Sequence, residues 1–276
     1  MTGTRKHADP EAGGGQEQRL AGGNLSRVVR VGDSVRRPAG DWTPAVHALL
    51  DHLARKGFDA APRAHGLDEA GREVLSYLPG EVAGADQPWP DWCWSDETLT
   101  GVARLLRRYH ETVADFAPPP GARFRLTSRP LAPGEIVCHN DVAPYNLVRR
   151  KDGGLALIDW DVAGPGPALD DVAFAARSFA PLHPDDACRQ LGFRALDERP
   201  RRLRLFLDGY GLAQRDDFID RVQARLAASI ERITAAAARG ERAFQQLISN
   251  GLLEPVEASR AWIDAHRDRL EDAIRA

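Results

Sequence analysis

The chain has 276 residues, 43% of them hydrophobic, which suffices for one large domain or for two lobes, and its net charge of −3 gives no reason to expect nucleic acid or an anionic membrane as a partner. Its cysteines, Cys93, Cys138 and Cys188, are too few and too far apart for a disulfide framework or a thiolate zinc site. Because no run approaches the ~18 apolar residues of a membrane span and the first residues have no apolar signal core, we expect a cytoplasmic protein whose partner is a small molecule.

The N-terminal part predicts a leader followed by strands. Residues 1–19 are rich in Gly, Glu, Gln and Arg with hardly an apolar anchor, so we expect them to be disordered. Strands over 26–31 and 35–37 flank a Gly-Asp-Ser turn, which predicts a hairpin. A helix is expected over 43–57, because a threonine cap and a first-turn proline precede leucines on one face, and a further strand is expected over 72–78.

A tryptophan-rich linker follows. The segment 82–95 holds Trp89, Trp92 and Trp94 among prolines and acids, which suits a linker that packs against the protein rather than a free tether. Apolar residues at helical spacing then predict a helix over 96–116.

The second half of the chain joins a short β segment to a series of helices. A strand over 136–138 precedes a polar loop, and a hairpin joins strands over 146–150 and 155–160. Helices are predicted beyond it over 168–180, 185–192, 199–210, 214–238, 240–250 and 254–275. We therefore expect an N-terminal lobe over 20–80, a larger lobe over 81–276, and a cleft between them.

The loop from His139 to Asn146 and the strand that ends at Asp159 carry the strongest chemical signal. Asp141 can accept a proton from a hydroxyl nucleophile, and Asn146, five residues later, offers a neutral oxygen to Mg²⁺. Asp159 supplies a charged metal ligand. Phosphoryl transfer needs these side chains in this order.

With these motifs the chain resembles the aminoglycoside phosphotransferase and choline kinase-like families of small-molecule kinases, from about residue 20 to 180 and most strongly over 136–175. The resemblance implies an α+β, two-lobed protein-kinase-like fold, with a small N-terminal antiparallel-sheet lobe and a larger helical C-terminal lobe. It implies ATP (or GTP) and Mg²⁺ as cofactors. The implied reaction moves the γ-phosphate to a hydroxyl group of a small molecule, such as an aminoglycoside-like antibiotic, an amino alcohol or a sugar.

The resemblance also implies a role for each motif residue. Asp141 is similar to the catalytic base, and Asn146 and Asp159 are similar to the metal ligands. His139 is implied to brace the loop without transferring protons. Asp171 resembles the buried aspartate that holds the catalytic loop through its backbone amides.

The implied nucleotide contacts lie in the N-terminal lobe. Gly22 and Gly23 occupy the position of the phosphate-covering turn, although a Gly-Gly-Asn sequence alone is more often a plain hairpin turn. Ser76 to Leu78 occupy the position of the hinge, whose backbone pairs with adenine.

The chain departs from the family at the phosphate-binding lysine, because Arg36 and Arg37 occupy the strand where that lysine is usual. Strand alternation puts Val35 and Arg37 on one face, so Arg37 points at the phosphates if Val35 lines the adenine pocket; position 36 remains an alternative. The next helix offers His47 and Asp51 where a glutamate is usual, so the usual lysine–glutamate pair is missing.

Two other functions fit parts of the sequence. A kinase-like protein that binds nucleotide or ligand without transfer is compatible with the missing pair, but the intact Asp141, Asn146 and Asp159 oppose it. The loop from Asp159 to Asp161 also resembles the nucleophile loop of haloacid-dehalogenase phosphatases. That family needs a downstream basic residue, usually lysine, and no lysine follows Lys151. The acceptor and the oligomeric state stay open.

Overall fold

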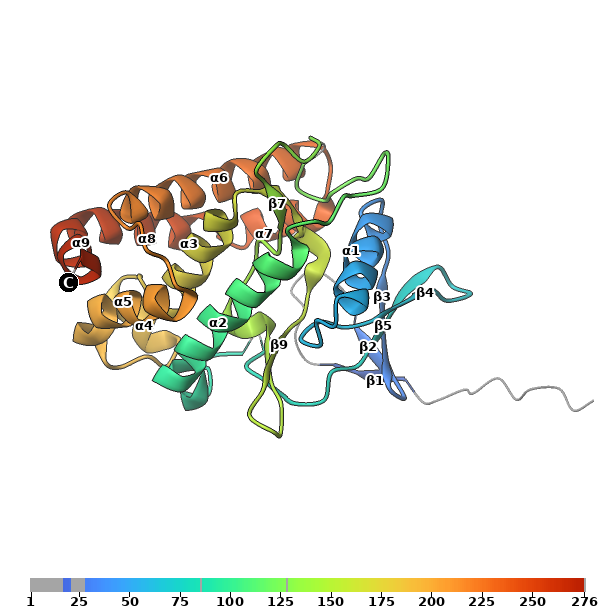
Figure 1. Ribbon diagram of the computed structural model, residues 1–276, viewed down its shortest axis with the longest axis horizontal. Coiled ribbons are helices and arrows are strands. Elements are labelled where there is room, and N and C mark those ends of the chain that lie inside the picture. Colours follow the sequence, from blue (N-terminus) through green and yellow to red (C-terminus); the bar gives the residue numbers. More distant parts are fainter. Residues whose placement is uncertain (1–16, 21–27, 85, 128, 276) are drawn as a thin grey trace, which may run out of the picture.

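The computed structural model describes residues 17–20, 28–84, 86–127 and 129–275 (Figure 1). The N-terminal strands lie with one helix at one end of the molecule and most helices lie at the other, in agreement with the predicted α+β class. The N-terminal strands form an antiparallel sheet in the order β1-β2-β3-β5-β4. Their bounds are β1 Gln18–Arg19, β2 Val29–Val31, β3 Ser34–Pro38, β4 Ala64–Leu67 and β5 Arg72–Ser76.

The register of β3 against β5 positions the charged residues of the N-terminal sheet. Arg37 on β3 lies directly opposite Glu73 on β5.

Helix α1 (Thr43–Arg55) begins with a proline in its first turn, and the Gly40 amide donates to the Thr43 hydroxyl. One face of α1 is buried through alanine, valine and leucine side chains, so the helix is held against the core.

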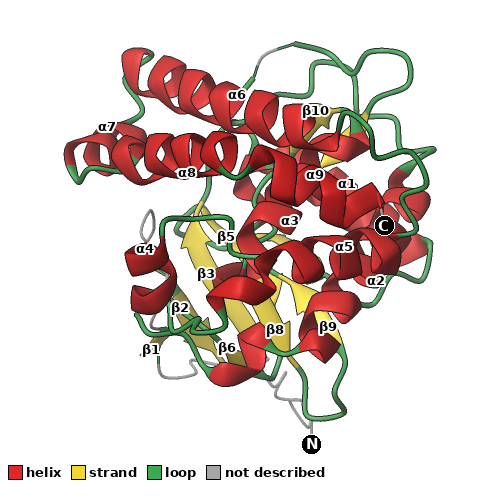
Figure 2. Cartoon of the chain, turned by 90° about the vertical axis from the view of Figure 1, so that its left-hand side faces the viewer, coloured by secondary structure: helices red, strands yellow, loops and turns green. Residues whose placement is uncertain are grey.

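The C-terminal part contains two small antiparallel sheets. One has the order β6 (Glu81–Val82), β8 (Leu147–Arg149), β9 (Leu155–Leu157), and in the other β7 (Ile136–Cys138) pairs with β10 (Gly164–Gly166). The helices are α2 Asp96–Val113, α3 Ala168–Phe179, α4 Asp185–Gln190, α5 Arg199–Tyr210, α6 Phe218–Ala238, α7 Arg242–Ser249, α8 Leu253–Ala265 and α9 Arg267–Arg275. Figure 2 shows α6 alongside α7 and α8. No helix in the described ranges is long and apolar enough to cross a membrane.

The predicted elements are largely confirmed, with differences that have physical reasons. The sequence pattern missed β4, where the pairing register shifts, and β10, whose Gly-Pro-Gly sequence is typical of a loop. The helix predicted over 254–275 is two helices, because the chain turns at His266, whose ring stacks on Trp262 with centroids 4.0 Å apart.

The predicted leader over residues 1–19 is wrong at its end. Gln18 and Arg19 form β1 and pair with β2. Residues 1–16 lie outside the described residues, as do residues 26 and 27 of the predicted first strand.

Candidate active site

Asp171 holds the loop between β7 and β8 by its backbone. The first turn of α3 brings its side chain, which is fully buried, to the amides of His139 and Asn140, which donate to its two oxygens over 2.7 and 2.6 Å. Burial disfavours the charged carboxylate, but hydrogen bonds from His110 and from the Asn140 amide hold the pKa of Asp171 below its usual value.

Asn140 fixes the shape of the same loop. Its φ of 68° places it in the left-handed region, which asparagine tolerates better than most residues. Its side-chain amide donates to the carbonyls of Val162 and Gly164 over 3.1 and 3.3 Å. Arg225 of α6 donates to the Asn140 carbonyl over 2.9 Å. The residue before Asp141 is therefore held from three sides.

Asp141 lies at the centre of the loop, half-buried. The Tyr145 hydroxyl donates to Oδ1 over 2.6 Å and the Asn146 side-chain amide donates to Oδ2 over 2.8 Å. Burial raises the pKa of Asp141 to about 6; the nearby Asp159 charge adds to the rise, and the Tyr145 hydrogen bond opposes it. This carboxylate is oriented and more basic than an exposed one.

His139 is buried beneath the loop and braces it. Its Nε2 is 3.1 Å from the Ile158 carbonyl, which can only accept, so Nε2 carries the proton. Its Nδ1 then accepts from the Asp141 amide over 3.3 Å. Burial lowers the pKa of His139, which keeps the imidazole neutral, and its ring packs 4.5 Å from that of Trp160.

Arg37 links the N-terminal sheet to the Asp159 loop. Its Nε donates to Glu73, its Nη1 lies 2.9 Å from Asp159 Oδ1, and its Nη2 lies 2.6 Å from Asp161 Oδ1. Burial disfavours the charged guanidinium, but its three carboxylate partners raise the pKa of Arg37. Arg36 points elsewhere, 3.6 Å from Asp68. Of the two predicted alternatives, the structure brings Arg37 to the candidate metal ligand.

Glu73, Asp161 and Arg125 are members of this network that the sequence patterns did not assign. The family resemblance places the acidic partner on the helix that follows β3, whereas Glu73 comes from β5, the strand opposite Arg37. His47 of α1 hydrogen-bonds to Glu73 over 2.9 Å. Arg125 lies 3.1 Å from Asp161 Oδ2, stacked over the Trp42 ring at 4.3 Å. The expectation that the acidic partner is missing is therefore corrected: Arg37 and Glu73 form the ion pair. The pairing register of β3 and β5, which places Glu73 opposite Arg37, is the signal that would have identified this ion pair.

Asn146 and Asp159 have oxygens that suit a hard cation. Because the Asn146 amide nitrogen is bound to Asp141, its Oδ1 points away and accepts no hydrogen bond from the described residues. Asp159 has a φ of 62°, and its side chain is 41% exposed, so one carboxylate oxygen remains open beside the Arg37 contact. The Ile158 amide donates to the Asn146 carbonyl over 3.0 Å, which joins the two segments. One amide and one carboxylate are the few protein ligands that Mg²⁺ takes when phosphates complete its shell.

The remaining predicted nucleotide residues are Gly22, Gly23, Ser76 and Leu78. Gly22 and Gly23 are outside the described residues. The Ser76 amide donates to the Arg63 carbonyl over 2.9 Å, so it is already used within the sheet. Leu78 packs half-buried against the core. In the predicted hinge, the Ser76 amide is thus not free for adenine.

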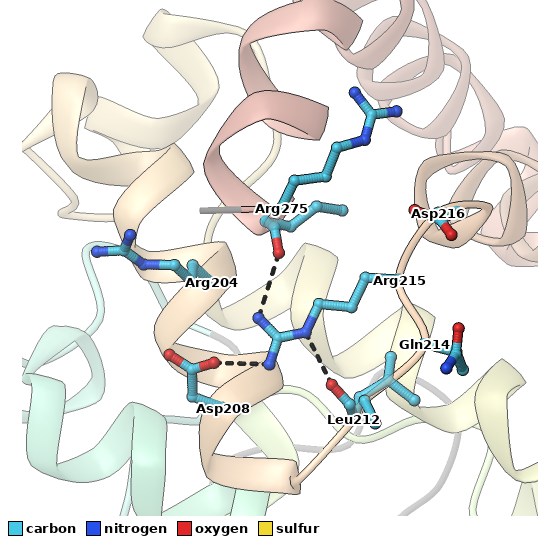
Figure 3. A pocket seen from close by; sticks show the side chains of 9 residues that line it. Arg204, Asp208, Leu212, Gln214, Arg215, Asp216 and Arg275 are labelled. Carbon is cyan, nitrogen blue, oxygen red and sulfur yellow. Dashed lines mark hydrogen bonds and ion pairs between the residues drawn. The ribbon is translucent and has the colours of Figure 1, made fainter.

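A polar cavity of about 620 Å³ opens elsewhere, beside the ends of α5 and α9 (Figure 3). Arg215 crosses it, donates to the Leu212 carbonyl over 2.7 Å and pairs with Asp208 at 2.6 Å. It also reaches the Ile274 carbonyl over 3.3 Å. These contacts tie helix ends together, and none of the predicted site residues lines the cavity.

A sheet lobe joined to a helical lobe, with a braced aspartate loop facing an Asp-x-Asp loop, is the architecture of small-molecule kinases. The chain belongs to the phosphotransferase enzyme family, whose model matches residues 123–206. It is 36% identical over 267 residues to the trifolitoxin immunity protein of Rhizobium leguminosarum bv. trifolii, across 92% of this chain and 97% of that protein.

Solved structures of small-molecule kinases share the fold of this chain. An amicoumacin kinase in complex with AMP-PNP, Ca²⁺ and Ami has a TM-score of 0.59 at 12% identity, covering 91% of each chain. A choline/ethanolamine kinase family protein from Mesorhizobium loti has a TM-score of 0.54 at 17% identity, covering 96% of this chain and 94% of that one. The GDP complex of an aminoglycoside 2'-phosphotransferase-IIIa has a TM-score of 0.57 at 16% identity, covering 89% and 92%. The kinase-like fold overturns the dehalogenase-like phosphatase interpretation of the Asp159 loop.

Proposed function

We propose that the protein transfers the γ-phosphate of ATP (or GTP) to a hydroxyl group of a small molecule, with Asp141 as the general base. The observation that carries this proposal is the Asp141 carboxylate, oriented by two donors and with its pKa raised to about 6. A base with such a pKa is largely ionised at neutral pH and still basic enough to take a proton. Each carboxylate oxygen has two lone pairs, so both can accept a further hydrogen bond from the acceptor hydroxyl.

Asn146 and Asp159 are the proposed ligands of Mg²⁺, which neutralises charge on the phosphates when bound. Their free oxygens and the hydrogen bond between their segments support this role. Arg37 is proposed to contact the phosphates, because its guanidinium already lies at Asp159. Gly22, Gly23 and Leu78 are proposed to complete the nucleotide site.

Turnover of two variants tests this division of roles. Asp141→Asn is expected to lower kcat by about 10²–10⁴ with Mg²⁺-dependent nucleotide binding kept, because only the proton acceptor is lost. Asp159→Asn is expected to weaken the Mg²⁺ dependence of binding itself. Asp152→Asn, in the exposed turn of the β8–β9 hairpin, is the matched control and should behave as wild type. Wild-type turnover in Asp141→Asn rejects the proposal, and nucleotide binding without transfer in the wild type favours the non-catalytic alternative.

The similarity to an immunity protein favours a protective role. Because 36% identity extends over 97% of the trifolitoxin immunity protein, we propose that the acceptor is a toxic small molecule which phosphorylation inactivates. The chain should then protect a trifolitoxin-sensitive strain that expresses it, and Asp141→Asn should not. Equal protection by both proteins would indicate immunity by binding, and no protection by either would leave trifolitoxin outside the acceptor range.

A further inference from the structure

Two arginines beside the catalytic loop have no carboxylate partner. Arg225 of α6 is 4% exposed and uses its guanidinium on the Asn140 carbonyl and the Ser229 hydroxyl. Arg177 of α3 donates to the Ser259 hydroxyl over 3.0 Å. Neither arginine forms a salt bridge with any described residue, and the buried Nε of each has no hydrogen-bond acceptor there. Arg177 is half-buried with its Nε enclosed, and a fully buried arginine such as Arg225 is usually paired.

The Arg225 guanidinium lies beside the loop that carries Asp141, and Arg177 is linked to that loop through Phe174 and Tyr145. Arg225 binds the carbonyl of Asn140, the residue that precedes Asp141. Its guanidinium also lies 5.0 Å from the ring of Phe174, which is one helical turn before Arg177 on the same face of α3. The positive charge of Arg177 acts on the Tyr145 hydroxyl, whose pKa is raised first by burial and is lowered in part by Arg177. Tyr145 is the residue that donates to Asp141.

The surrounding contact between α3 and α6 does not supply the missing negative charge. Arg221 and Arg232 of α6 lie 3.7 and 3.8 Å from Asp170 of α3, so that carboxylate already faces two guanidinium groups. Arg232 also donates to the Asn140 side chain over 3.3 Å. We call Arg177, Arg221, Arg225, Arg232 and Asp170, which come from the packed helices α3 and α6, the α3–α6 seam. The α3–α6 seam therefore carries more positive charges than negative ones.

A buried charge without a counter-ion is unfavourable, and the pKa values of Arg177 and Arg225 reflect this cost. Burial lowers the pKa of Arg177 to about 10 and also lowers the pKa of Arg225. An oxyanion bound by both guanidinium groups would offset their positive charge, and the planar guanidinium fork matches the oxygens of a carboxylate or phosphate.

We propose that the phosphoryl acceptor carries an oxyanion, a carboxylate or a phosphate group, which Arg177 and Arg225 bind while an acceptor hydroxyl faces Asp141. This inference rests on the proposed function and narrows its substrate class. The acceptor site then selects anionic alcohols over polycations.

Three acceptors that share a carbon skeleton test the charge preference. Glycerol is neutral, glycerate adds a carboxylate and glycerol phosphate adds a phosphate group. Wild-type KM is expected to be at least about tenfold lower for one of the two anionic compounds than for glycerol, since a hydrogen-bonded charge contributes about 1.5–3 kcal/mol. The compound that shows the preference identifies the oxyanion.

Variants at Arg177 assign the preference to the seam. Arg177→Gln is expected to remove most of the ratio between the anionic and the neutral KM, and Arg177→Lys to keep part of it, since the charge remains without the fork. Arg189→Gln, an exposed arginine of α4 paired with Asp186, is the control and should keep the full ratio. Arg225 is a poorer site for substitution because it also holds Asn140.

Binding without turnover separates this inference from the proposed function. Glycerate or glycerol phosphate alone should raise the melting temperature of the wild type more than glycerol does, and should do so less in Arg177→Gln. That result supports the oxyanion site even if no phosphoryl transfer is seen. A lack of transfer would count against the proposed function and not against the oxyanion site. Transfer to glycerol or an amino alcohol with equal or better KM, and anion effects identical in wild type and Arg177→Gln, would overturn the inference while leaving the kinase assignment intact.

Discussion

Two groups of buried charges border the catalytic loop, and they differ in balance. In the first, Arg37 and Arg125 meet Glu73, Asp159 and Asp161, so every guanidinium has carboxylate partners. In the second, the α3–α6 seam, Arg177 and Arg225 have none among the described residues. The first network pairs its guanidinium groups with carboxylates of the protein and connects the lobes, whereas the second leaves two guanidinium groups without a carboxylate. The difference suggests which side of Asp141 receives the acceptor.

The largest effect is expected from breaking the balanced network at Arg37. Arg37→Met leaves buried carboxylates without their cation and should lower the free energy of unfolding by about 3–5 kcal/mol. It should also raise the KM for ATP and lower kcat, with Arg37→Lys recovering part of both losses. Chemical denaturation and steady-state kinetics measure these changes.

Arg36→Met is the matched control for Arg37. Arg36 is part-exposed and 3.6 Å from Asp68, so its loss should change the free energy of unfolding by less than about 1 kcal/mol. A sensitive Arg36 beside a tolerant Arg37 would contradict the arrangement of β3 described above.

Asp171 is the next most sensitive position, because it satisfies two loop amides. Asp171→Ala should lower the free energy of unfolding by about 1–3 kcal/mol and reduce turnover, since the amides of His139 and Asn140 lose their acceptor. Asp186→Ala, at an exposed position in α4, controls for helix effects. Lost turnover at an unchanged melting temperature would instead make Asp171 a direct participant in the reaction.

The α3–α6 seam should respond much more weakly than the Arg37 network, or in the opposite sense. Arg177→Met removes a buried charge that has no carboxylate partner, so the free energy of unfolding without ligand should fall by less than about 1 kcal/mol or rise. Comparison with Arg37→Met under the same denaturation conditions sharpens the contrast. A loss as large as that of Arg37→Met would show that the seam is balanced by contacts in the native state.

The smallest expected effect is a shift in the pH profile. Asp141 must be ionised to accept a proton, so kcat should fall as the pH drops through about 6. The Tyr145 hydrogen bond stabilises the ionised form and lowers the pKa, so Tyr145→Phe should raise the pKa and move this acidic limb to higher pH. A limb that stays in place or moves to lower pH would show that Tyr145 does not tune the base.

The candidate site residues of the Asp141 loop could be picked out from the sequence because their signal is local. Asp141 and Asp159 each follow a short strand and Asn146 precedes one, in a fixed order, and the family resemblance gave each a role that remains a proposal. Helices such as α3 and α5 were predicted from apolar residues at helical spacing.

The charged networks could not be predicted in the same way, because they depend on pairing between distant segments. Glu73 meets Arg37 through the β3–β5 register, and Arg125 reaches Asp161 from a loop without regular structure. Arg225 is likewise buried because α6 packs on α3, where its guanidinium meets the ring of Phe174. The contact between α3 and α6 cannot be predicted from the local pattern of a single sequence.

The transfer of label from γ-labelled ATP tests the central claim most directly. Wild-type protein with Mg²⁺ and a panel of hydroxyl compounds, anionic, neutral and cationic, is expected to move the label to an acceptor, and Asp141→Asn is expected to leave it in ATP. Label that stays in ATP with every acceptor, or that Asp141→Asn transfers at the wild-type rate, would contradict the account.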